Sequence, residues 1–398
     1  MITVAQAIAI LDEAVAAGAT EDVPLRDAGG RVLARDVHSD VDWPPFDTSA
    51  MDGYAVRLSD LPARGVLVSE RAQTVPAGAA PPGPLSPGEC VRVMTGAPLP
   101  LGTEAIVPLE RAFRERGGIR LEEVPGPGTH VRRRGESVRA GASLLKAGSR
   151  LSPTQVALAA LAGAEPLTVF RRPRVAVAVT GDEIVAPGER PGPGKLRDSN
   201  GPMLISLCRA RGYSVRALGQ VRDETEAVER LFGVAGEEDG FLITTGGVSA
   251  GDKDLLPELA RRGGYEILFH KVAVRPGKPI ACGRRGQALW FGLPGNPVSA
   301  SVGFHVFVRH ALDRAEGDAR PGPRRVTARL SGEARGGGRE TYRDCLLTNE
   351  HGENRAQPLV SAGSHDIAAH ARANALLRIP ADTPSLPAGE TAECLMLE

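Results

Sequence analysis

Three kinds of hydrophobic pattern follow one another along the chain. Residues 2–17 have the apolar spacing of an amphipathic helix, and Thr3 with Gln6 provides the capping box expected at the start of one. Because Asp12 and Glu13 fall inside this segment, it is not typical of a secretory signal. We therefore expect a helix within residues 1–20.

The second pattern, from about residue 45 to 137, has no helical periodicity. Short apolar runs at 90–94 and 105–107 alternate with turns rich in glycine and proline, which predicts a small β domain. A short helix then starts at the Ser152 cap and ends near Gly163. We expect this helix and the N-terminal helix to form a connecting domain that the β domain interrupts.

The third pattern begins at Pro173, where strands and helices alternate. The expected strands lie at 175–179, 217–221 and 241–243 and around residues 272 and 290, and the expected helices lie at 202–211, after Asp223 and near 254–262. This alternation is typical of a mostly parallel, doubly wound sheet. After Gly317 the pattern becomes short-stranded again, which predicts a mainly β segment at the C-terminus.

The predicted fold class is a multidomain α/β plus β protein, and the length of 398 residues agrees with two to four domains. The expected domains are a discontinuous connecting domain, an inserted β domain, a doubly wound α/β domain and a C-terminal β domain. Their expected boundaries are residues 1–44 with 140–170, 45–139, 171–318 and 319–398, respectively.

The composition narrows the classes of partner. There are 48 Lys and Arg residues and 48 Asp and Glu residues, so the formal charge is zero, which removes the usual electrostatic case for nucleic acid or membrane binding. The five cysteines show no Cys-x-x-Cys spacing, which argues against a zinc or iron–sulfur motif and favours reduced thiols. No run approaches the ~18 apolar residues of a membrane span. We expect a soluble, cytoplasmic protein.

Two glycine-rich loops carry the strongest chemical signal. One is Thr244–Asp252, which directly follows the strand at 241–243, and the other is Pro294–Pro297, which follows a strand-like run. In the second loop, Asn296 suits an N-cap and Pro297 a first helical position. Because both loops present backbone amides at the carboxyl ends of strands, they predict a phosphate-bearing ligand.

Lys271, Arg275 and Lys278 form a second candidate feature. Alternation along a strand would place Lys271 and Arg275 on one face, and Lys278 follows a Pro-Gly turn. A solvated edge strand is the plain alternative, but the nearby loops favour a clamp for an oxyanion or a phosphate.

Acidic residues form two further candidate features. Asp182 and Glu183 follow the strand at 175–179, where active sites of such sheets lie, although a solvated loop explains them equally well. Asp47 and Asp52 could hold a hard cation, but their spacing favours a turn with Asp52-Gly53 as a tight hairpin.

Other polar groups have ordinary structural explanations. Arg197–Asn200 precedes a helix, as N-capping residues do, and Arg132–Arg134 is typical of a solvated charge run. His305 and His310 lie on an apolar helix, which favours a structural role. No Ser/His/Asp or Cys/His nucleophile arrangement stands out, so we expect electrostatic rather than covalent catalysis.

Taken in order, these strings resemble the molybdopterin molybdotransferase family, which includes the E domain of gephyrin. The strings are FDTSAMDGYAV, VMTGAP, RRGESV, TGDE, RDSN, TTGGVSAGD, RPGKP and GLPGNPVSA, and the likeness covers nearly the whole chain. The resemblance implies an enzyme that inserts molybdate into adenylylated molybdopterin with Mg²⁺ and releases AMP, the last step of molybdenum cofactor synthesis. It also implies four domains and an elongated homodimer whose clefts are each built from both subunits.

The resemblance also implies roles for individual residues. The implied catalytic residues are Asp52, Thr95, Glu183 and Asp252, and the implied Mg²⁺ ligands are Asp52, Asp182, Glu183 and Asp252. The implied substrate-binding residues are Arg134, Ser199, Asn200, Gly246, Gly247, Ser249, Lys271, Arg275, Lys278, Pro294, Gly295, Asn296, Pro297, Ser299, Arg339 and Ser364.

Three positions depart from the family's usual pattern. The family often has lysine where Arg275 stands and tyrosine where Lys253 stands, and it usually has an acidic residue at the position of Gly240. A gephyrin-like scaffold and a molybdopterin adenylyltransferase are alternative functions. The retained anion-binding strings favour the enzyme over the scaffold, and the flanking domains argue against the adenylyltransferase, which is also a candidate partner. The choice between molybdate and tungstate stays open.

Overall fold

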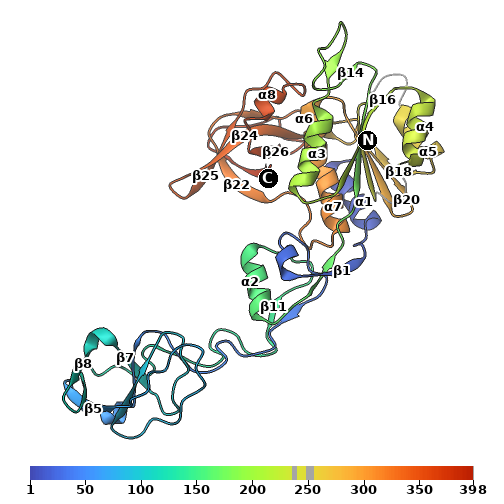
Figure 1. Cartoon of the computed structure of the whole chain (residues 1–398). Helices are drawn as coiled ribbons and strands as arrows, with labels where there is room; N and C mark the ends of the chain where they lie inside the picture. Colours follow the sequence, from blue (N-terminus) through green and yellow to red (C-terminus); the bar gives the residue numbers. More distant parts are fainter. Residues whose placement is uncertain (235–239, 248–254, 398) are drawn as a thin grey trace.

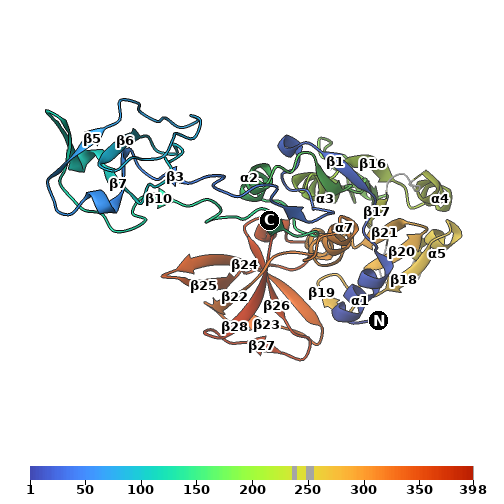
Figure 2. The same cartoon turned by 90° about the horizontal axis from the view of Figure 1, so that it is seen from below.

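The molecule is elongated, with a small β domain projecting from a larger body (Figures 1 and 2). A computed structural model of the whole chain describes residues 1–234, 240–247 and 255–397. Two lengths of extended chain join the β domain to a middle region, which in turn contacts the α/β domain (Figure 1). Within these described ranges, no helix is long and apolar enough to cross a membrane.

A six-stranded sheet of order β16-β13-β17-β21-β20-β18 forms the centre of the α/β domain. The parallel strands are β13 (Val175–Thr180), β16 (Val215–Val221), β17 (Phe241–Thr245) and β21 (Ala288–Leu293). Two antiparallel strands complete one edge, β18 (Glu266–His270) and β20 (Ala281–Arg285). The predicted mostly parallel sheet is confirmed, although this antiparallel pair was not predicted.

Alternation along the parallel strands explains why both faces of the sheet are covered. Val175 and Val177 of β13 join a core with α3 (Asn200–Ala210) and with the continuous helical segment of α6 (Pro297–Gly303), η4 (Phe304–Val308) and α7 (Arg309–Ala315). Ala176 and Ala178 face the other way, towards α4 (Thr225–Val234) and α5 (Leu255–Arg262). The sheet is therefore doubly wound, as predicted.

The N-terminal helix α1 (Val4–Ala14) packs in a different place from the one expected. Its predicted capping box forms between Thr3 and Gln6. Its buried side chains Val4, Ala7 and Leu11 nevertheless join the α/β core beside α7, because that core offers them an apolar surface. The helix α2 (Pro153–Leu161) packs in a separate core of the middle region with β1 (Thr20–Val23) and β12 (Leu167–Phe170).

The projecting β domain contains a six-stranded sheet of order β7-β4-β6-β5-β9-β8. Its strands are β4 (Gly53–Val56), β5 (Val66–Glu70), β6 (Glu89–Val93), β7 (Ala105–Pro108), β8 (Ala112–Glu115) and β9 (Gly118–Leu121). Residues 45–137 are all described and contain short 3₁₀ turns but no α-helix, which confirms the prediction for this region.

The tight hairpin expected at Asp52-Gly53 is not formed. β3 (Thr48–Ser49) pairs with β10 (Val131–Arg132), whereas β4 pairs with β6 and β7. A Cβ atom on Gly53 would lie 2.3 Å from the carbonyl oxygen of Val107, so glycine is required by the close approach of β7.

The C-terminal domain is a closed, barrel-like sheet. Its ring consists of β24 (Glu340–Glu350), β25 (Glu353–Pro358), β22 (Arg325–Leu330), β28 (Thr391–Met396) and β26 (Ala375–Ile379), and β26 pairs again with β24. The mainly β C-terminal segment is thus confirmed.

The strand expected near residue 272 belongs to this C-terminal sheet. β19 (Val274–Arg275) pairs in parallel with β24 and so ties the α/β domain to the C-terminal domain. Because Lys271 precedes the strand and has a φ of 66°, the prediction that alternation places Lys271 and Arg275 on one face is wrong.

Candidate functional site

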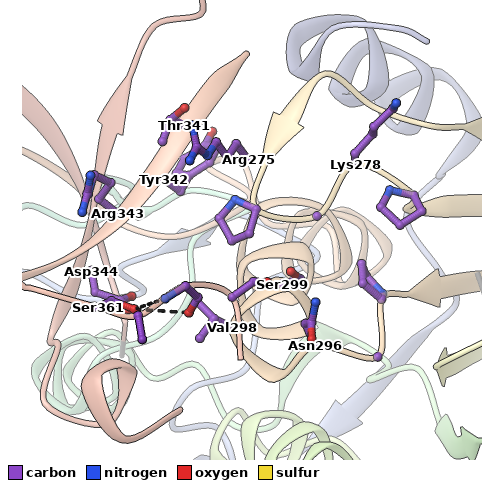
Figure 3. A pocket seen from close by; sticks show the side chains of 18 of the residues that line it. Arg275, Lys278, Asn296, Val298, Ser299, Thr341, Tyr342, Arg343, Asp344 and Ser361 are labelled. Carbon is purple, nitrogen blue, oxygen red and sulfur yellow. Dashed lines mark hydrogen bonds between the residues drawn. The ribbon is translucent and has the colours of Figure 1, made fainter. Parts of the chain in front are cut away.

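A pocket of about 770 Å³ lies between the α/β domain and the C-terminal domain (Figure 3). One wall consists of Gly246 and Gly247 of the first glycine-rich loop, Pro294–Asn296 of the second, residues 275–279 and the start of α6. The opposite wall consists of β23 (Ala334–Arg335), the first half of β24 and the loop at 359–364. Loops at the carboxyl ends of β17 and β21 therefore meet here, as expected for a doubly wound sheet.

The first glycine-rich loop presses directly on the end of β13. A Cβ atom on Gly246, which has a φ of 96°, would lie 2.2 Å from the carbonyl oxygen of Thr180. A Cβ on Gly247, with a φ of 61°, would lie 2.9 Å from both Leu256 and the Thr180 hydroxyl. Both positions therefore require glycine, which leaves this backbone open towards the pocket.

Asn200 joins the two glycine-rich loops by hydrogen bonds. Its Nδ2 donates to the Thr245 hydroxyl at 2.9 Å and to the carbonyl oxygen of Gly295 at 2.8 Å. The Thr245 hydroxyl in turn donates to the carbonyl oxygen of Pro294 at 2.9 Å. Asn200 is buried and does not line the pocket, so its side chain holds the two loops together and does not contact a ligand in the pocket.

The second loop leads into α6 as the sequence predicts, with Asn296 at the N-cap and Pro297 at the first helical position. The Asn296 side chain makes no capping hydrogen bond and lines the pocket instead (Figure 3). The amide of Val298 donates to the carbonyl oxygen of Ser364 at 3.1 Å. This helix start is thus partly used by the C-terminal domain, and fewer amides are free than the sequence suggested.

Cationic side chains outnumber carboxylates around the pocket. The lining cations are Arg275, Lys278, Arg335, Arg339 and Arg343, and the lining carboxylates among the described residues are Glu183 and Asp344. Asp344 is held by His370 at 2.7 Å. Arg275 and Lys278 form no ion pair with any described carboxylate. Because the described carboxylates neutralise only part of this positive charge, the pocket favours an anionic ligand.

The arginines of the C-terminal wall are oriented by backbone oxygens. Arg339 donates to the carbonyl oxygen of Val274 at 3.1 Å, and Arg343 donates to that of Arg335 at 3.4 Å. A Cβ on Gly337 would lie 2.5 Å from Nη1 of Arg275, so the glycine makes room for that guanidinium. Sequence reasoning missed Arg335; the Gly-Gly-Gly run between Arg335 and Arg339 is a signal that could have indicated it.

Negative charge collects at the end of β13, beside the pocket. Glu183 lines the pocket, and the Asp182 carboxylate accepts the amide of Asp223 at 3.3 Å. Burial raises the pKa of Asp223, and the neighbouring charges of Asp182 and Glu183 raise it further. No three acidic, histidine or cysteine side chains are placed to hold a metal in the part of the chain that the structure describes. Mg²⁺ is usually held by one or two carboxylates together with substrate phosphates, and Glu183 fits that pattern.

Asp52, Thr95 and Arg134 do not line the pocket of the same chain. Asp52 directly precedes β4, Thr95 follows β6 and Arg134 follows β10, and all three strands belong to the projecting part of the molecule (Figure 2). Asp52 Oδ1 accepts the amide and the hydroxyl of Thr95 at 2.7 and 2.8 Å, and these bonds lower the pKa of Asp52. Asp47 pairs with Arg133 at 2.6 Å. The two carboxylates therefore have separate partners, which favours a structural turn over a shared cation site.

The structure brings many, but not all, of the predicted site residues together. Those that line the pocket are Glu183, Gly246, Gly247, Arg275, Lys278, Pro294, Gly295, Asn296, Ser299, Arg339 and Ser364. Those that do not are Asp52, Thr95, Arg134, Asp182, Ser199, Asn200, Lys271 and Pro297. Ser249 and Asp252, like Lys253, lie outside the described residues. Their roles in binding and catalysis stay predictions.

Three family models match successive parts of the chain. They are described as the MoeA N-terminal region (domain I and II), matching residues 2–163, a probable molybdopterin binding domain, matching residues 176–314, and the MoeA C-terminal region (domain IV), matching residues 328–397.

Individual relatives are similar over almost the whole length. A molybdopterin molybdenumtransferase 2 of Mycobacterium tuberculosis is 37% identical over 380 residues, covering 92% of each chain. A molybdopterin molybdenumtransferase of Haemophilus influenzae is 34% identical, covering 94% of this chain and 92% of its own. The crystal structure of a molybdopterin biosynthesis MoeA protein from Pyrococcus horikoshii superposes with a TM-score of 0.83 at 29% identity, covering 100% of both chains.

Proposed function

This chain belongs to the molybdopterin molybdenumtransferase family, and we propose that it inserts molybdenum into molybdopterin during synthesis of the molybdenum cofactor. The observation that carries the proposal is the pocket itself. It combines two glycine-rich loops with five cationic side chains, which suits a ligand with phosphate groups and a second, separate oxyanion.

The proposed substrates are adenylylated molybdopterin and molybdate. In the reaction, two Mo–S bonds form to the dithiol of the pterin, and one molybdate oxygen leaves as water with the two thiol protons. Hydrolysis of the phosphoanhydride bond consumes one water and releases AMP. The loops at Gly246–Gly247 and Pro294–Asn296 would hold the phosphates, whereas Arg275 and Lys278 would hold molybdate.

Mg²⁺ is part of the proposal as a charge-neutralising partner of the substrate phosphates. Glu183 is the pocket carboxylate that would hold it, with the nearby charge of Asp182 in support. When bound, the ion would polarise the phosphoanhydride. The residues of the chain would orient both substrates and offset their negative charge.

We also propose a homodimer in the cytoplasm, with each cleft completed by the β domain of the other subunit. The supporting observation is that Asp52 and Thr95 adjoin β4 and β6 of the projecting β domain (Figure 2) and do not line the pocket of their own chain. A partner copy could bring them to it. The adenylyltransferase that supplies the substrate is a candidate partner of this dimer.

A mixing experiment tests the shared clefts. An Asp52→Asn chain and a Glu183→Gln chain should each be inactive alone, because each lacks one carboxylate of every cleft. When subunits exchange, the mixed dimer should regain one intact cleft and part of the activity. Inactivity of the mixture, in a preparation shown by mass spectrometry to contain mixed dimers, would contradict the shared cleft.

The reaction itself is tested by incubating the purified chain with adenylylated molybdopterin, molybdate and Mg²⁺ and measuring AMP release. We expect release that depends on molybdate and on Mg²⁺, with omission of each as the control. Release of AMP at the same rate without molybdate would contradict the proposal.

A further inference from the structure

Ser301, His370 and Asp344 form a continuous hydrogen-bonded chain beneath the pocket. Nε2 of His370 lies 2.8 Å from the Ser301 hydroxyl oxygen, and its Nδ1 lies 2.7 Å from Oδ1 of Asp344. Ser301 belongs to α6, Asp344 to β24, and His370 to the short helix α8 (Ile367–His370). The chain therefore links the α/β domain to the C-terminal domain, and all three side chains are buried.

This arrangement has the residue types of a hydrolase triad, but its placement excludes that use. Ser301 is 1% exposed and does not line the pocket, so its hydroxyl cannot reach a substrate there. A neutral His370 that donates from Nδ1 to Asp344 accepts the Ser301 hydroxyl at Nε2, and a protonated His370 donates to both. The chain of bonds thus persists in either state, as a structural link would require.

The link is continuous with the C-terminal wall of the pocket. Asp344 itself lines the pocket, and its carbonyl oxygen accepts the amide of Leu359 at 2.9 Å. Asp366 accepts the amide of Ala362 at 2.9 Å and that of Ala369 at 3.0 Å, which joins the pocket loop to α8. The loop at 359–364, α8 and the start of β24 are therefore held as one unit, and His370 joins this unit to α6 in addition to the bond between the Val298 amide and Ser364.

We propose that His370 is a positioning residue, which holds the C-terminal wall of the pocket against α6 in the arrangement that binds an oxyanion. The inference rests on the proposed function for the identity of that anion, molybdate. Arg339 and Arg343 act from this wall, and an oxyanion gains most from donors that are fixed before it arrives. Without the link the wall would keep its fold and its bonds to β19 and Val298, but its distance from the glycine-rich loops would be fixed less tightly.

The test compares two buried serines with matched hydrogen bonds. Ser301→Ala breaks the link at Nε2 of His370. Ser39→Ala removes a hydroxyl that is 3% exposed and donates to the carbonyl oxygen of Val41 at 2.8 Å, in the middle region away from the pocket. Binding of molybdate to the full-length chain is measured by calorimetry, and amide exchange at Leu359 and Ala362 is measured by mass spectrometry without any ligand.

We expect Ser301→Ala to weaken molybdate binding by about tenfold, the effect of one buried polar atom left without its partner. It should also speed amide exchange in the loop at 359–364. Ser39→Ala and Ser301→Ala should lower the melting temperature by similar amounts. Ser39→Ala should nevertheless leave molybdate affinity and amide exchange in the loop at their wild-type values. His370→Gln keeps most of the side-chain volume but cannot reach both Ser301 and Asp344, so it should have the same effect as Ser301→Ala. It replaces Ser301→Ala in the test if Ser301→Ala does not fold.

Any of three outcomes would overturn the inference. If the wild-type chain binds molybdate and Ser301→Ala binds it equally well, with unchanged exchange in the loop, the link has no positioning role. If Ser39→Ala weakens molybdate binding as much as Ser301→Ala, the effect belongs to general stability. A wild-type chain that binds no molybdate would contradict the proposed function as well.

Discussion

Two clusters of arginine in this molecule have opposite surroundings. At the junction of the middle region with α7, Arg150 lies 3.0 Å from Asp313, 2.8 Å from Glu316 and 2.9 Å from Asp318. Arg172 also pairs with Glu316, at 3.3 Å. At the pocket, by contrast, Arg275 and Lys278 have no described carboxylate partner.

We infer from this difference that the arginines at the junction stabilise the fold, whereas the cations at the pocket bind a ligand. Asp313 is 1% exposed and Glu316 is fully buried, so their charges depend on the arginines around them. Burial opposes the charge of Arg150, but Glu316 and Asp313 outweigh it and hold the pKa of the guanidinium above its ordinary value. The pocket cations instead face a cavity, where a bound anion would be their partner.

Removal of the junction arginine should give the largest effect. Arg150→Met leaves the buried Asp313 and Glu316 carboxylates each with one arginine partner fewer, which should destabilise the protein by about 3 kcal/mol. Thermal unfolding monitored by circular dichroism is the measurement. Arg335→Met is the control. Arg335 is 78% exposed and lies 3.5 Å from Glu333, and an ion pair this exposed contributes little to the free energy of unfolding. Equal losses of stability in both variants would remove the distinction between the clusters.

Removal of a pocket cation should affect ligand binding and not stability, the opposite of removing Arg150. Lys278→Gln should leave the melting temperature unchanged and raise the molybdate concentration for half-maximal AMP release by roughly tenfold to a hundredfold, the worth of a hydrogen bond to a charged group. Affinity for adenylylated molybdopterin should change less, because the glycine-rich loops bind phosphate largely through backbone.

The conservative replacement Arg275→Lys is the control for this variant and should cost little, since it keeps the charge. If Lys278→Gln impairs binding of adenylylated molybdopterin and leaves the molybdate dependence unaltered, the cations belong to the phosphate site instead.

The same comparison shows what could be predicted from the sequence. β13, β17 and the two glycine-rich loops were found because strand patterns and Pro-Gly or Gly-Gly turns are local signals. The pairing of β19 with β24 and the contribution of Arg335 were not, because they depend on contacts between distant segments. The sequence predicted α1 and its capping box but not the core in which α1 packs. An apolar helix face shows that the helix is buried on one side, but it does not identify the core that it joins.

The link formed by Ser301, His370 and Asp344 is the clearest case of missing information. Its members are 26 and 69 residues apart, and none lies in a pattern that marks hydrogen-bonding partners. Burial lowers the pKa of His305 to about 3 and keeps its ring neutral, and the structural role expected for this histidine stays a prediction. Sequence composition could not show that His370 connects two domains.

A surface ion pair in the β domain should give the smallest effect. Arg71 and Glu89 lie 2.7 Å apart, and the hydrogen bond from Arg71 lowers the pKa of Glu89 to about 2. A lowered folded pKa adds stability above the ordinary value, so this contribution should be lost as the pH falls from about 4.5 towards about 2. We expect no more than ~1 kcal/mol, because solvent screens the pair.

Urea unfolding of the wild-type chain and of Glu89→Gln across this pH range is the measurement. The two stability curves should converge at the acidic end, where Glu89 is protonated and its ion pair is lost. A constant difference between the curves at every pH would show that the pair contributes nothing through its charge.

The most direct test of the account is the position of molybdenum in a crystal soaked with molybdate and AMP, located by its anomalous scattering. We expect a molybdenum peak inside the pocket within hydrogen-bonding distance of Arg275 or Lys278, with the AMP phosphate at the loops of Gly246–Gly247 and Pro294–Asn296. A peak at those loops, with the phosphate on the cations, would reverse the assignment. No peak in the pocket at saturating molybdate would contradict the claim that Arg275 and Lys278 bind this oxyanion.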